Sequence, residues 1–170
     1  MLDLAIKHEP ELQTLFADAF LDTRNRFYFG GGYSDKYKAD ESTWNKHEFV
    51  SVKNNKVIGY LSYNIDRRTN SANSLVAINF GERNLTFSRD FRQFLSDIFE
   101  KYGFRKLTFG VFIGNPAEKM YDRYIRKFGG RIVGINKEAG LLIDGKFYDY
   151  KEYEIFRNDY LSKLIGGKRN

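Results

Sequence analysis

The stretch from Ser74 to Tyr102 combines the two periods of apolar residues that are typical of a strand and of a helix. The run Leu75 to Phe80 is apolar, and its length fits a strand that is buried on both faces. A helix is expected after it, because apolar residues recur there at the spacing i, i+3, i+4, i+7. Its apolar stripe consists of Phe91, Phe94, Leu95, Ile98, Phe99 and Tyr102.

The turn between this strand and this helix is a candidate anion site. Ser88 is the expected N-cap of the helix, Asp90 lies in its first turn, and Gly103 follows its end. The residues from Gly81 to Phe87 must then direct the free N–H groups of the first helical turn past the carboxyl end of the strand. Backbone N–H groups arranged in this way bind phosphate and other anions.

The first part of the chain predicts a strand, a helix and a long irregular segment. Alternating apolar residues indicate a short strand from Leu2 to Lys7, and Pro10 opens a helix with one apolar face. From Asp22 to Lys46 neither period is present, apart from a short helix expected near residues 34–39. Loops of this length often line a binding site. We expect this segment to line a binding site because it is rich in aromatic residues, which are Phe27, Tyr28, Phe29, Tyr33, Tyr37 and Trp44.

A hairpin is expected next. Residues 48–53 and 56–66 read as two strands that meet at Asn54-Asn55, a pair that tolerates the positive φ angles of a type I′ turn. Residues 67–74 are polar and predict a turn that leads into the strand of the central stretch.

The second half of the sequence alternates strands and helices. Lys106 to Ile113 predicts a strand, and the helix before it has the length of a right-handed crossover, so this strand should run parallel to the previous one. Asn115 is the expected N-cap of the next helix, which ends at Gly129. A strand over residues 130–136, an Asp-Gly turn, a tyrosine-rich strand and a polar helix near residues 159–164 follow.

These elements predict a single domain over residues 1–170 of the α+β class, with residues 166–170 as a mobile tail. We expect a mixed, mostly antiparallel sheet of six to seven strands, flanked by helices, with one parallel strand pair.

The composition excludes several kinds of catalytic and metal-binding site. The 170 residues include no cysteine, which excludes disulfides, zinc–thiolate sites and thiol nucleophiles. The two histidines, His8 and His47, are expected to be structural or exposed, so we expect no metal site. The net charge of +6 is compatible with nucleic acid or with a small polyanionic ligand. No apolar run reaches the roughly 18 residues of a membrane span. The first residues are acidic where a signal peptide is basic, so we expect a cytoplasmic protein without a membrane partner.

Four short segments occur in an order and spacing that resemble one known family. Arg83-Asn84-Leu85-Thr86-Phe87-Ser88 is similar to a pyrophosphate loop of the form Gln/Arg-x-x-Gly-x-Gly/Ala. Asn115-Pro116-Ala117, followed by Met120-Tyr121, is similar to an Asn-x-x-Ala…Tyr segment, and residues 128–134 and 143–149 are similar to two closing strands. Together they resemble the GNAT superfamily of acyl-coenzyme A-dependent N-acetyltransferases over about residues 4–160, with the ribosomal-protein alanine acetyltransferases as the most similar branch.

The resemblance implies acetyl-coenzyme A (acetyl-CoA) as a co-substrate, bound where two parallel strands splay apart. Backbone groups of Ile78 and Phe80 would pair with the pantetheine arm, and an N–H near Phe80 would bind the oxyanion. The other cofactor-binding residues implied are Arg83, Asn84, Leu85, Thr86, Phe87, Ser88, Arg89 and Asn115. Thr86 and Ser88 stand where the family has glycine, and their hydroxyls can donate hydrogen bonds to phosphate.

The resemblance also implies that a primary amine attacks the thioester directly in a ternary complex. Either Tyr121 or Tyr124 would protonate the leaving thiolate, because Tyr121 fits the count from Asn115 and Tyr124 fits the count back from Gly129. Glu82 is the candidate general base, with a water relay as the alternative. The acceptor is expected to be a small-molecule or peptide amine.

Two other functions stay open. The strand over residues 106–113 is faintly similar to an RNA-recognition strand, but Phe109 and Phe112 should face opposite sides of the sheet and form no common stacking platform. Nucleic acid is therefore the weaker candidate partner. A GNAT-fold binding protein that has lost catalysis is the other alternative, since both loop glycines are replaced. The tyrosine-rich closing strands are compatible with a homodimer or with a core.

Overall fold

The computed structural model describes residues 1–28, 36–40, 44–81 and 84–166. The strands are β1 (Leu2–Leu4), β2 (Lys46–Lys53), β3 (Lys56–Asp66), β4 (Ser71–Asn79), β5 (Lys106–Phe112), β6 (Arg131–Leu141) and β7 (Phe147–Phe156). The helices are α1 (Glu9–Leu21), α2 (Leu85–Glu100), α3 (Glu118–Phe128) and α4 (Arg157–Gly166), with 3₁₀ turns η1 (Ala5–His8) and η2 (Thr23–Asn25).

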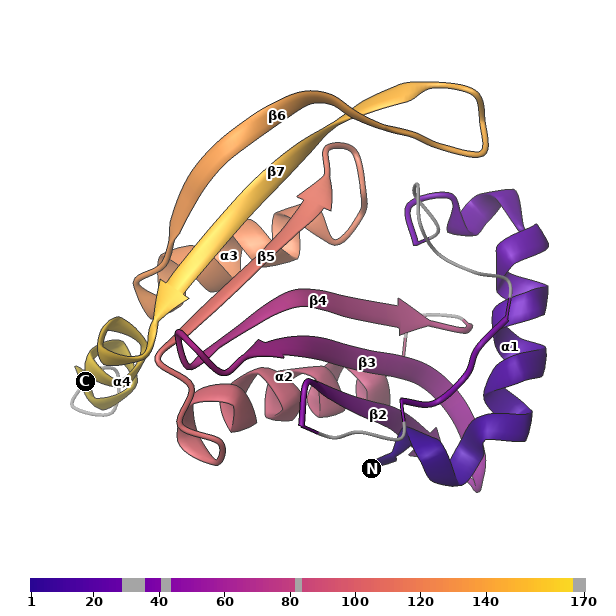
Figure 1. Ribbon diagram of the computed structural model, residues 1–170, viewed down its shortest axis with the longest axis horizontal. Helices are drawn as coiled ribbons and strands as arrows, with labels where there is room; N and C mark the ends of the chain where they lie inside the picture. The colour runs from indigo at the N-terminus through magenta and orange to yellow at the C-terminus, as the bar shows by residue number, and fades with distance from the viewer. Residues whose placement is uncertain (29–35, 41–43, 82–83, 167–170) are drawn as a thin grey trace.

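All seven strands belong to one sheet in the order β1-β2-β3-β4-β5-β7-β6. Among the described strands, β4 and β5 run parallel and every other neighbouring pair is antiparallel. In Figure 1, β6 and β7 curve away from the lower strands as a long arch, and α1 stands at the open side of the sheet. The predicted α+β class and the single parallel pair are confirmed.

Each face of the sheet has its own hydrophobic core. Phe94 and Ile98 of α2 are fully buried on one face, together with residues of α3 and α4. Leu12 and Phe16 of α1 pack in a second cluster. Successive side chains of a strand point to opposite faces, so the neighbours Tyr60 and Leu61 on β3 belong to different cores. The sheet is therefore a central layer between α1 on one face and α2 and α3 on the other, and Figure 1 shows α2 and α3 behind the strands.

The β2–β3 hairpin has the predicted turn. Asn54 and Asn55 adopt φ angles of 51° and 59°, as a type I′ turn requires. The arms pair from Lys53 opposite Lys56 to Lys46 opposite Asn64, so β2 starts slightly before the predicted residue 48.

The strand β4 begins earlier than its apolar run. The polar turn predicted over residues 67–74 was too long, because Ser71 and Ala72 are buried in β4 and make its pairs with β5. An extra residue in β4, between the pairs Asn73–Asn64 and Val76–Ser62, forms a β-bulge. Ser74 in this bulge has a φ of 52°, a left-handed conformation that is uncommon for serine. The bulge bends β4 just after its pairing with β5.

The helix α2 also begins early. Asn84, and not Ser88, is its N-cap, since the Asn84 side chain accepts a hydrogen bond from the Phe87 N–H at 2.7 Å. Ser88 instead donates its hydroxyl to the Asn84 carbonyl at 3.1 Å. The prediction was wrong because Leu85 is 86% exposed and lies outside the apolar stripe that marked the helix. Asp90, expected in the first turn, is buried and accepts a hydrogen bond from the Ser51 hydroxyl at 2.7 Å.

Two predictions in the first forty residues were wrong. The strand expected over residues 2–7 ends at Leu4, and the chain continues as the 3₁₀ turn η1. Of the short helix expected over residues 34–39, residues 36–39 are not helical, and residues 34–35 lie outside the described part.

The helix α3 follows a turn that Asn115 caps. The Asn115 side chain accepts from the Ala117 N–H at 2.9 Å, and the Glu118 carboxylate accepts from the Gly114 N–H at 3.0 Å. The N-cap of the helix is Ala117 and not the predicted Asn115, because the turn that Asn115 caps comes before the first helical residue, Glu118. The helix ends at Gly129 with a φ of 76°, as predicted. A left-handed residue at this position satisfies the last carbonyls of a helix.

The closing elements are longer than predicted. β6 reaches Leu141 instead of residue 136, and α4 runs from Arg157 to Gly166. The mobile tail was predicted to begin at residue 166. Gly166 is the last residue of α4, and residues 167–170 lie outside the described residues. No helix of the described part is long and apolar enough to cross a membrane.

His47 gives the fold a pH-dependent contribution to stability. Its ring is half-buried against Tyr102, and its Nδ1 lies 2.6 Å from the Tyr63 hydroxyl. Burial lowers the pKa of His47, and the nearby Arg67 and Lys101 lower it further. The unfolded chain therefore takes up a proton more readily than the folded chain, so the free energy of unfolding falls as the pH drops below the ordinary histidine pKa.

We expect the His47→Gln variant to show a weaker loss of stability than the parent between about pH 7.5 and about pH 5, a range that spans the ordinary histidine pKa of about 6.5. Urea unfolding at several pH values measures this difference. An unchanged slope of stability against pH in the variant would contradict the assignment.

Candidate functional site

The strands β4 and β5 separate after a short stretch of pairing. They pair at Ser71–Lys106 and Ala72–Leu107, and no further pair follows between them in the described residues. β5 remains paired with β7 up to Phe112, so the separation lies on its β4 side. The resulting wedge between β4 and β5 opens toward the carboxyl ends of both strands, where ligands bind in open parallel sheets.

The backbone of β4 presents alternate residues to the wedge. The Phe80 N–H donates to the Ile58 carbonyl at 3.0 Å, so it faces β3. Because bonded pairs alternate in an antiparallel ladder, Ile78 also pairs with Tyr60 on β3. The expectation that backbone groups of Ile78 and Phe80 face the wedge is therefore corrected by one residue. Ala77 and Asn79 present their backbone groups on the side of β5.

A narrow cleft of about 70 Å³ lies in the wedge. Its walls come from residues 75–78 of β4 and residues 110–112 of β5. Asn115, which follows the carboxyl end of β5, and Tyr121 of α3 also line it. The cleft thus brings together three of the residues that the sequence resemblance implied, which are Ile78, Asn115 and Tyr121.

Aromatic side chains restrict the cleft from the outer side. The Asn79 N–H donates a hydrogen bond to the Tyr28 hydroxyl, and burial raises the pKa of Tyr28. Phe27 contacts Tyr148 of β7 edge-to-face at a centroid distance of 5.4 Å. The segment after η2 therefore lies between the wedge and the β6–β7 arch. A loop lined by aromatic residues was expected here, and both Phe27 and Tyr28 line the cleft.

Tyr150 lies close to β5 at a glycine. A Cβ on Gly110 would lie 2.4 Å from the Tyr150 ring, so only glycine permits this approach. Tyr150 also contacts Phe112 edge-to-face at 5.2 Å. Tyr150 was expected only as a core or dimer residue, and its position in the cleft wall was missed because no local sequence signal links it to Gly110.

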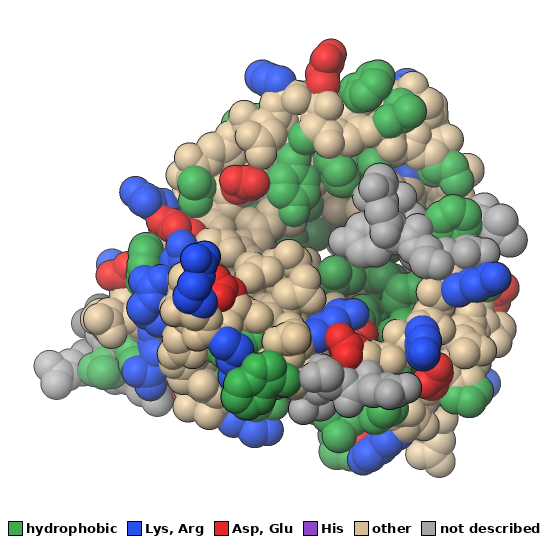
Figure 2. Space-filling model, viewed as in Figure 1, with side chains coloured by type: hydrophobic (Ala, Val, Ile, Leu, Met, Phe, Trp, Pro, Cys, Tyr) green, Lys and Arg blue, Asp and Glu red, His purple; other side chains and the backbone are tan. Residues whose placement is uncertain are grey.

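A larger cavity of about 420 Å³ lies beside the cleft, on the α1 side. Phe16 of α1, Tyr37 and Tyr60 form part of its wall. Leu75, Val76 and Tyr150 line both cavities, so the two spaces share a wall at the bulge of β4. Figure 2 shows a hollow lined by hydrophobic side chains between the arch and the lower strands. We call this space the acceptor-side cavity.

A buried carboxylate lies behind the acceptor-side cavity. The Tyr60 hydroxyl donates to Glu48, the Lys46 ammonium lies 2.8 Å from the same carboxylate, and the Asp40 N–H donates to it at 2.8 Å. The pKa of Tyr60 is raised, by burial first and by the charge of Glu48 second. Glu48 therefore has three hydrogen-bond donors around it.

The start of α2 offers two backbone donors. Asn84 caps the Phe87 N–H, which leaves the N–H groups of Leu85 and Thr86 in the first turn without an intrahelical acceptor. A shallow depression of about 480 Å³ runs from these residues along the outer face of α2, past Arg89 and Arg92. Positive charge and the helix dipole both favour an anion here.

The other residues of the predicted pyrophosphate loop fall into three groups. Ser88 and Arg89 are exposed on the first turns of α2. Phe87 points into the core, since a Cβ on Gly59 of β3 would lie 2.3 Å from its ring. Glu82 and Arg83, the candidate base and the leading residue of the loop, lie outside the described residues.

The two candidate tyrosines of α3 occupy different environments. Tyr121 is buried, lines the cleft in the wedge and contacts Phe109 edge-to-face at 5.1 Å. Tyr124 packs against Phe128 at 4.7 Å, and its buried hydroxyl has no hydrogen-bond partner. Burial raises the pKa of Tyr124. Only Tyr121 is in contact with the cleft, so the geometry favours it over Tyr124.

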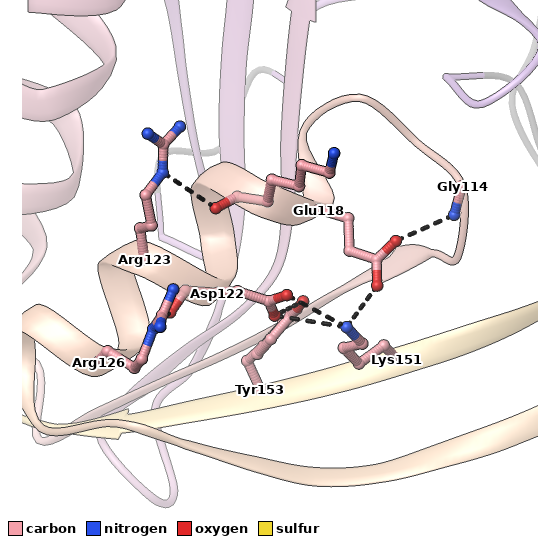
Figure 3. Close-up of polar contacts among 8 residues, drawn as sticks. Gly114, Glu118, Asp122, Arg123, Arg126, Lys151 and Tyr153 are labelled. Carbon is pink, nitrogen blue, oxygen red and sulfur yellow. Dashed lines mark hydrogen bonds and ion pairs between the residues drawn. The ribbon is translucent and has the colours of Figure 1, made fainter.

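A network of charges joins α3 to β7 (Figure 3). The Lys151 ammonium lies between Glu118, which it contacts closely, and Asp122 at 3.4 Å. The Tyr153 hydroxyl donates to Asp122 at 2.8 Å, and the Tyr153 ring stacks on Phe109 at 5.1 Å. The hydrogen bond from Lys151 lowers the pKa of Glu118. Because Asp122 follows Tyr121 in α3, the network holds this turn of the helix against the sheet.

The described residues contain neither an aromatic platform for nucleic-acid bases nor a cluster of side chains that could hold a metal ion. Phe109 is buried in the core, whereas Phe112 contacts Tyr150 on the opposite face, so they form no platform for bases. No group of three or more His, Asp and Glu side chains could hold a metal ion within the described part of the chain.

The fold of this chain is that of the GNAT N-acetyltransferases, as comparison with solved structures shows. A crystal structure of spermidine N-acetyltransferase from Vibrio cholerae, in complex with CoA and spermine, matches 95% of this chain and 97% of that chain, with a TM-score of 0.70 and 18% identity. A point mutant of spermidine N-acetyltransferase SpeG from Vibrio cholerae matches 96% and 99%, with a TM-score of 0.68 and 18% identity.

A third structure, described as a probable acetyltransferase, matches 69% of this chain with a TM-score of 0.56 and 15% identity. This chain spans 65% of the length of that protein. No protein-family model and no curated protein matches the sequence.

Proposed function

We propose that this protein is an N-acetyltransferase that transfers the acetyl group of acetyl-CoA to a primary amine. The observation that carries the proposal is the wedge between β4 and β5, whose cleft shares the wall of Leu75, Val76 and Tyr150 with the acceptor-side cavity. Two cavities that meet at one wall allow a thioester and an amine to approach each other from opposite sides.

The residues around the wedge fit coenzyme A. Its pantetheine arm carries amide groups, which the backbone groups of Ala77 and Asn79 on the β5 side of β4 can hydrogen-bond once the Tyr28 hydroxyl has left the Asn79 N–H. Its diphosphate is an anion, which the N–H groups of Leu85 and Thr86, with Arg89 and the hydroxyls of this turn, are suited to bind. Acetyl-CoA supplies an activated acyl group as its thioester.

In the proposed reaction the amine nitrogen attacks the acyl carbon, the C–N bond forms, and the C–S bond breaks. Tyr121 donates its phenolic proton to the departing sulfur, a role worth about 10²- to 10⁴-fold for a general acid. A backbone N–H of β4 that faces the wedge stabilises the negative oxygen of the tetrahedral intermediate. Glu82, or a water chain, takes the proton that the ammonium group of the acceptor loses.

The second candidate function is a GNAT-fold binding protein without catalysis. It is favoured by the small volume of the cleft, about 70 Å³, and by the Tyr28 hydroxyl, which takes the Asn79 N–H. A pantetheine arm needs more space than this, so Tyr28 has to move aside for the cofactor to enter.

Thermal unfolding and thiol release separate the two functions. For the N-acetyltransferase we expect CoA and acetyl-CoA to raise the melting temperature, and acetyl-CoA to release free thiol only when an amine acceptor is added. A raised melting temperature without thiol release over a broad amine panel would favour the binding protein. If neither CoA nor acetyl-CoA changes the melting temperature, and no thiol is released, the N-acetyltransferase function is excluded.

A single hydroxyl group tests the role of Tyr28. We expect the Tyr28→Phe variant to bind CoA about threefold to tenfold more tightly, because one neutral hydrogen bond that competes for the Asn79 N–H is removed. Isothermal titration calorimetry measures the two dissociation constants, with Tyr148→Phe as a control at an exposed tyrosine hydroxyl that bonds Asp144. Weaker binding by Tyr28→Phe would mean that the hydroxyl contacts the cofactor instead of competing with it.

A further inference from the structure

The wall between the cleft and the acceptor-side cavity contains one residue that does not belong to the two strands of the wedge. Leu75 and Val76 are part of β4, whereas Tyr150 is part of β7. In the sheet, β5 lies between β7 and β4. The Tyr150 side chain therefore extends across β5 to line the cleft between β4 and β5.

Contacts with β5 hold the Tyr150 ring in this position. The ring lies against Gly110, where a Cβ would be 2.4 Å away from it, and it meets the Phe112 ring edge-to-face at 5.2 Å. Gly140 of β6 makes room for Phe112 in turn, because a Cβ on Gly140 would lie 2.6 Å from the Phe112 ring. Since β7 is also paired with β5 along the whole of β5, the ring is attached to a rigid part of the sheet.

The other two residues of the wall are held by the two hydrophobic cores. Leu75 is buried in the core on the α2 side, and Val76 packs against the core on the α1 side. The outer side of the cleft is different, because Tyr28 closes it and has to move aside for the cofactor to enter. Entry of the cofactor therefore enlarges the cleft at Tyr28 and leaves the wall of Leu75, Val76 and Tyr150 in place.

From this fixed wall we infer that Tyr150 restricts the donor to short acyl groups. The inference rests on the proposed acyl transfer and names a residue that sets its donor specificity. In that reaction the amine comes from the acceptor-side cavity, so the acyl carbon lies at the shared wall. An acetyl group places only a methyl group there. Each further methylene of a longer acyl group meets the Tyr150 ring or takes the space of the attacking amine.

The Tyr150 ring is the part of the wall whose removal would change the available space most. It lines both the cleft of about 70 Å³ and the acceptor-side cavity of about 420 Å³. Without the ring the two spaces join, and a longer acyl chain can extend into the larger one. The bonds that form and break are those of the proposed reaction, so a smaller side chain at this position changes which donors fit and not the chemistry.

The test compares acyl-CoA donors of increasing length with the best amine of the panel. One methylene in an apolar pocket changes selectivity by about 10- to 200-fold, so we expect kcat/KM of the parent, from thiol release, to fall at least about tenfold from acetyl-CoA to propionyl-CoA and further for butyryl-CoA. Both donors are measured on the same protein, so their ratio does not depend on the fraction of active enzyme.

Three variants of Tyr150 and one control locate the selectivity. Tyr150→Ala is expected to raise the ratio of butyryl-CoA to acetyl-CoA by about tenfold or more. Tyr150→Leu, which keeps more of the apolar contact, should raise it as well and carries the test if the alanine variant does not fold. Tyr150→Phe keeps the ring and should keep the ratio of the parent. Phe147→Ala is the matched control on β7, because Phe147 is 62% exposed and is not among the described residues that line either cavity.

The outcomes separate this inference from the proposed function. A parent that uses acetyl-CoA and butyryl-CoA equally well overturns the inference and leaves acyl transfer standing. The same conclusion follows if Tyr150→Ala and Tyr150→Leu keep the ratio of the parent, or if Phe147→Ala changes it as much as they do. If no acyl-CoA releases thiol with any amine, the proposed function fails together with the inference.

Discussion

Replacing Tyr121 with phenylalanine is expected to lower kcat by about 10²- to 10⁴-fold, the usual contribution of a general acid. The ring of Tyr121 packs against Phe91, Phe109 and Tyr153, and phenylalanine keeps these contacts. The variant loses only the hydroxyl of a residue that lines the cleft, so its dissociation constant for CoA should stay close to that of the parent. Steady-state thiol release with the best acceptor, together with calorimetry of CoA binding, measures both effects.

Tyr124→Phe is the matched control for this experiment. Tyr124 lies three residues further along α3, but its hydroxyl is buried without a partner outside the cleft. Removing it should leave kcat unchanged and should not lower the melting temperature, because an unsatisfied buried hydroxyl stabilises nothing. A large loss of kcat in Tyr124→Phe with normal activity in Tyr121→Phe would exchange the roles of the two tyrosines.

The largest effect on stability is expected at Lys151. The Lys151→Met variant leaves the carboxylates of Glu118 and Asp122 next to each other without their cation, in a partly buried contact between α3 and β7. Breaking a buried ion pair costs about 3–5 kcal/mol, and the partial exposure of both carboxylates places the expected loss near the lower end, at about 2–3 kcal/mol. Urea unfolding of the parent and the variant measures the difference.

A double variant shows whether the charge or the packing of Lys151 is responsible. Adding Glu118→Gln to Lys151→Met removes one of the two uncompensated charges and should restore part of the lost stability. Because the network holds the turn of α3 that carries Tyr121, we also expect kcat of Lys151→Met to fall while CoA binding changes less. A Lys151→Met variant as stable as the parent would show that the network is not an energetic link between α3 and β7.

The sequence predicted the fold best where the apolar pattern and the turn residues agree. The Asn54-Asn55 turn and the Gly129 helix end require positive φ angles, and both positions have them. The stripe of α2 is buried as expected, because Phe94 and Ile98 recur at helical spacing. Patterns of this kind are local, so one sequence is sufficient to recognise them.

The errors occur where tertiary contacts decide the local structure. Ser71 and Ala72 read as a polar turn, yet they form the pairing with β5 from which the wedge opens. In β4, alternate residues bond to β3, and the residues between them face the wedge. Ile78 and Phe80 bond to β3, so the backbone groups that face the wedge are those of their neighbours and not the expected ones. A bulge at Ser74 leaves no periodic signal in the sequence, because serine is compatible with both a strand and a turn.

The candidate site was predicted in part. The position of Tyr121 and Asn115 at the cleft follows from the resemblance, and the aromatic loop was expected to line a binding site. Tyr150 and the other residues that line the acceptor-side cavity come from elements far apart in the sequence, and only the folded chain brings them together. The choice between Tyr121 and Tyr124 depended on the helix orientation, since counting from either end of α3 gave different answers.

A crystal structure grown with saturating CoA is the most direct test of the central claim that the wedge between β4 and β5 holds the cofactor. We expect the pantetheine arm between the two strands, its amides bonded to the backbone of Ala77 and Asn79, the diphosphate at the N–H groups of Leu85 and Thr86, and the Tyr28 hydroxyl displaced from Asn79. CoA bound elsewhere on the molecule, or a wedge still closed by Tyr28 at saturating CoA, would contradict the account.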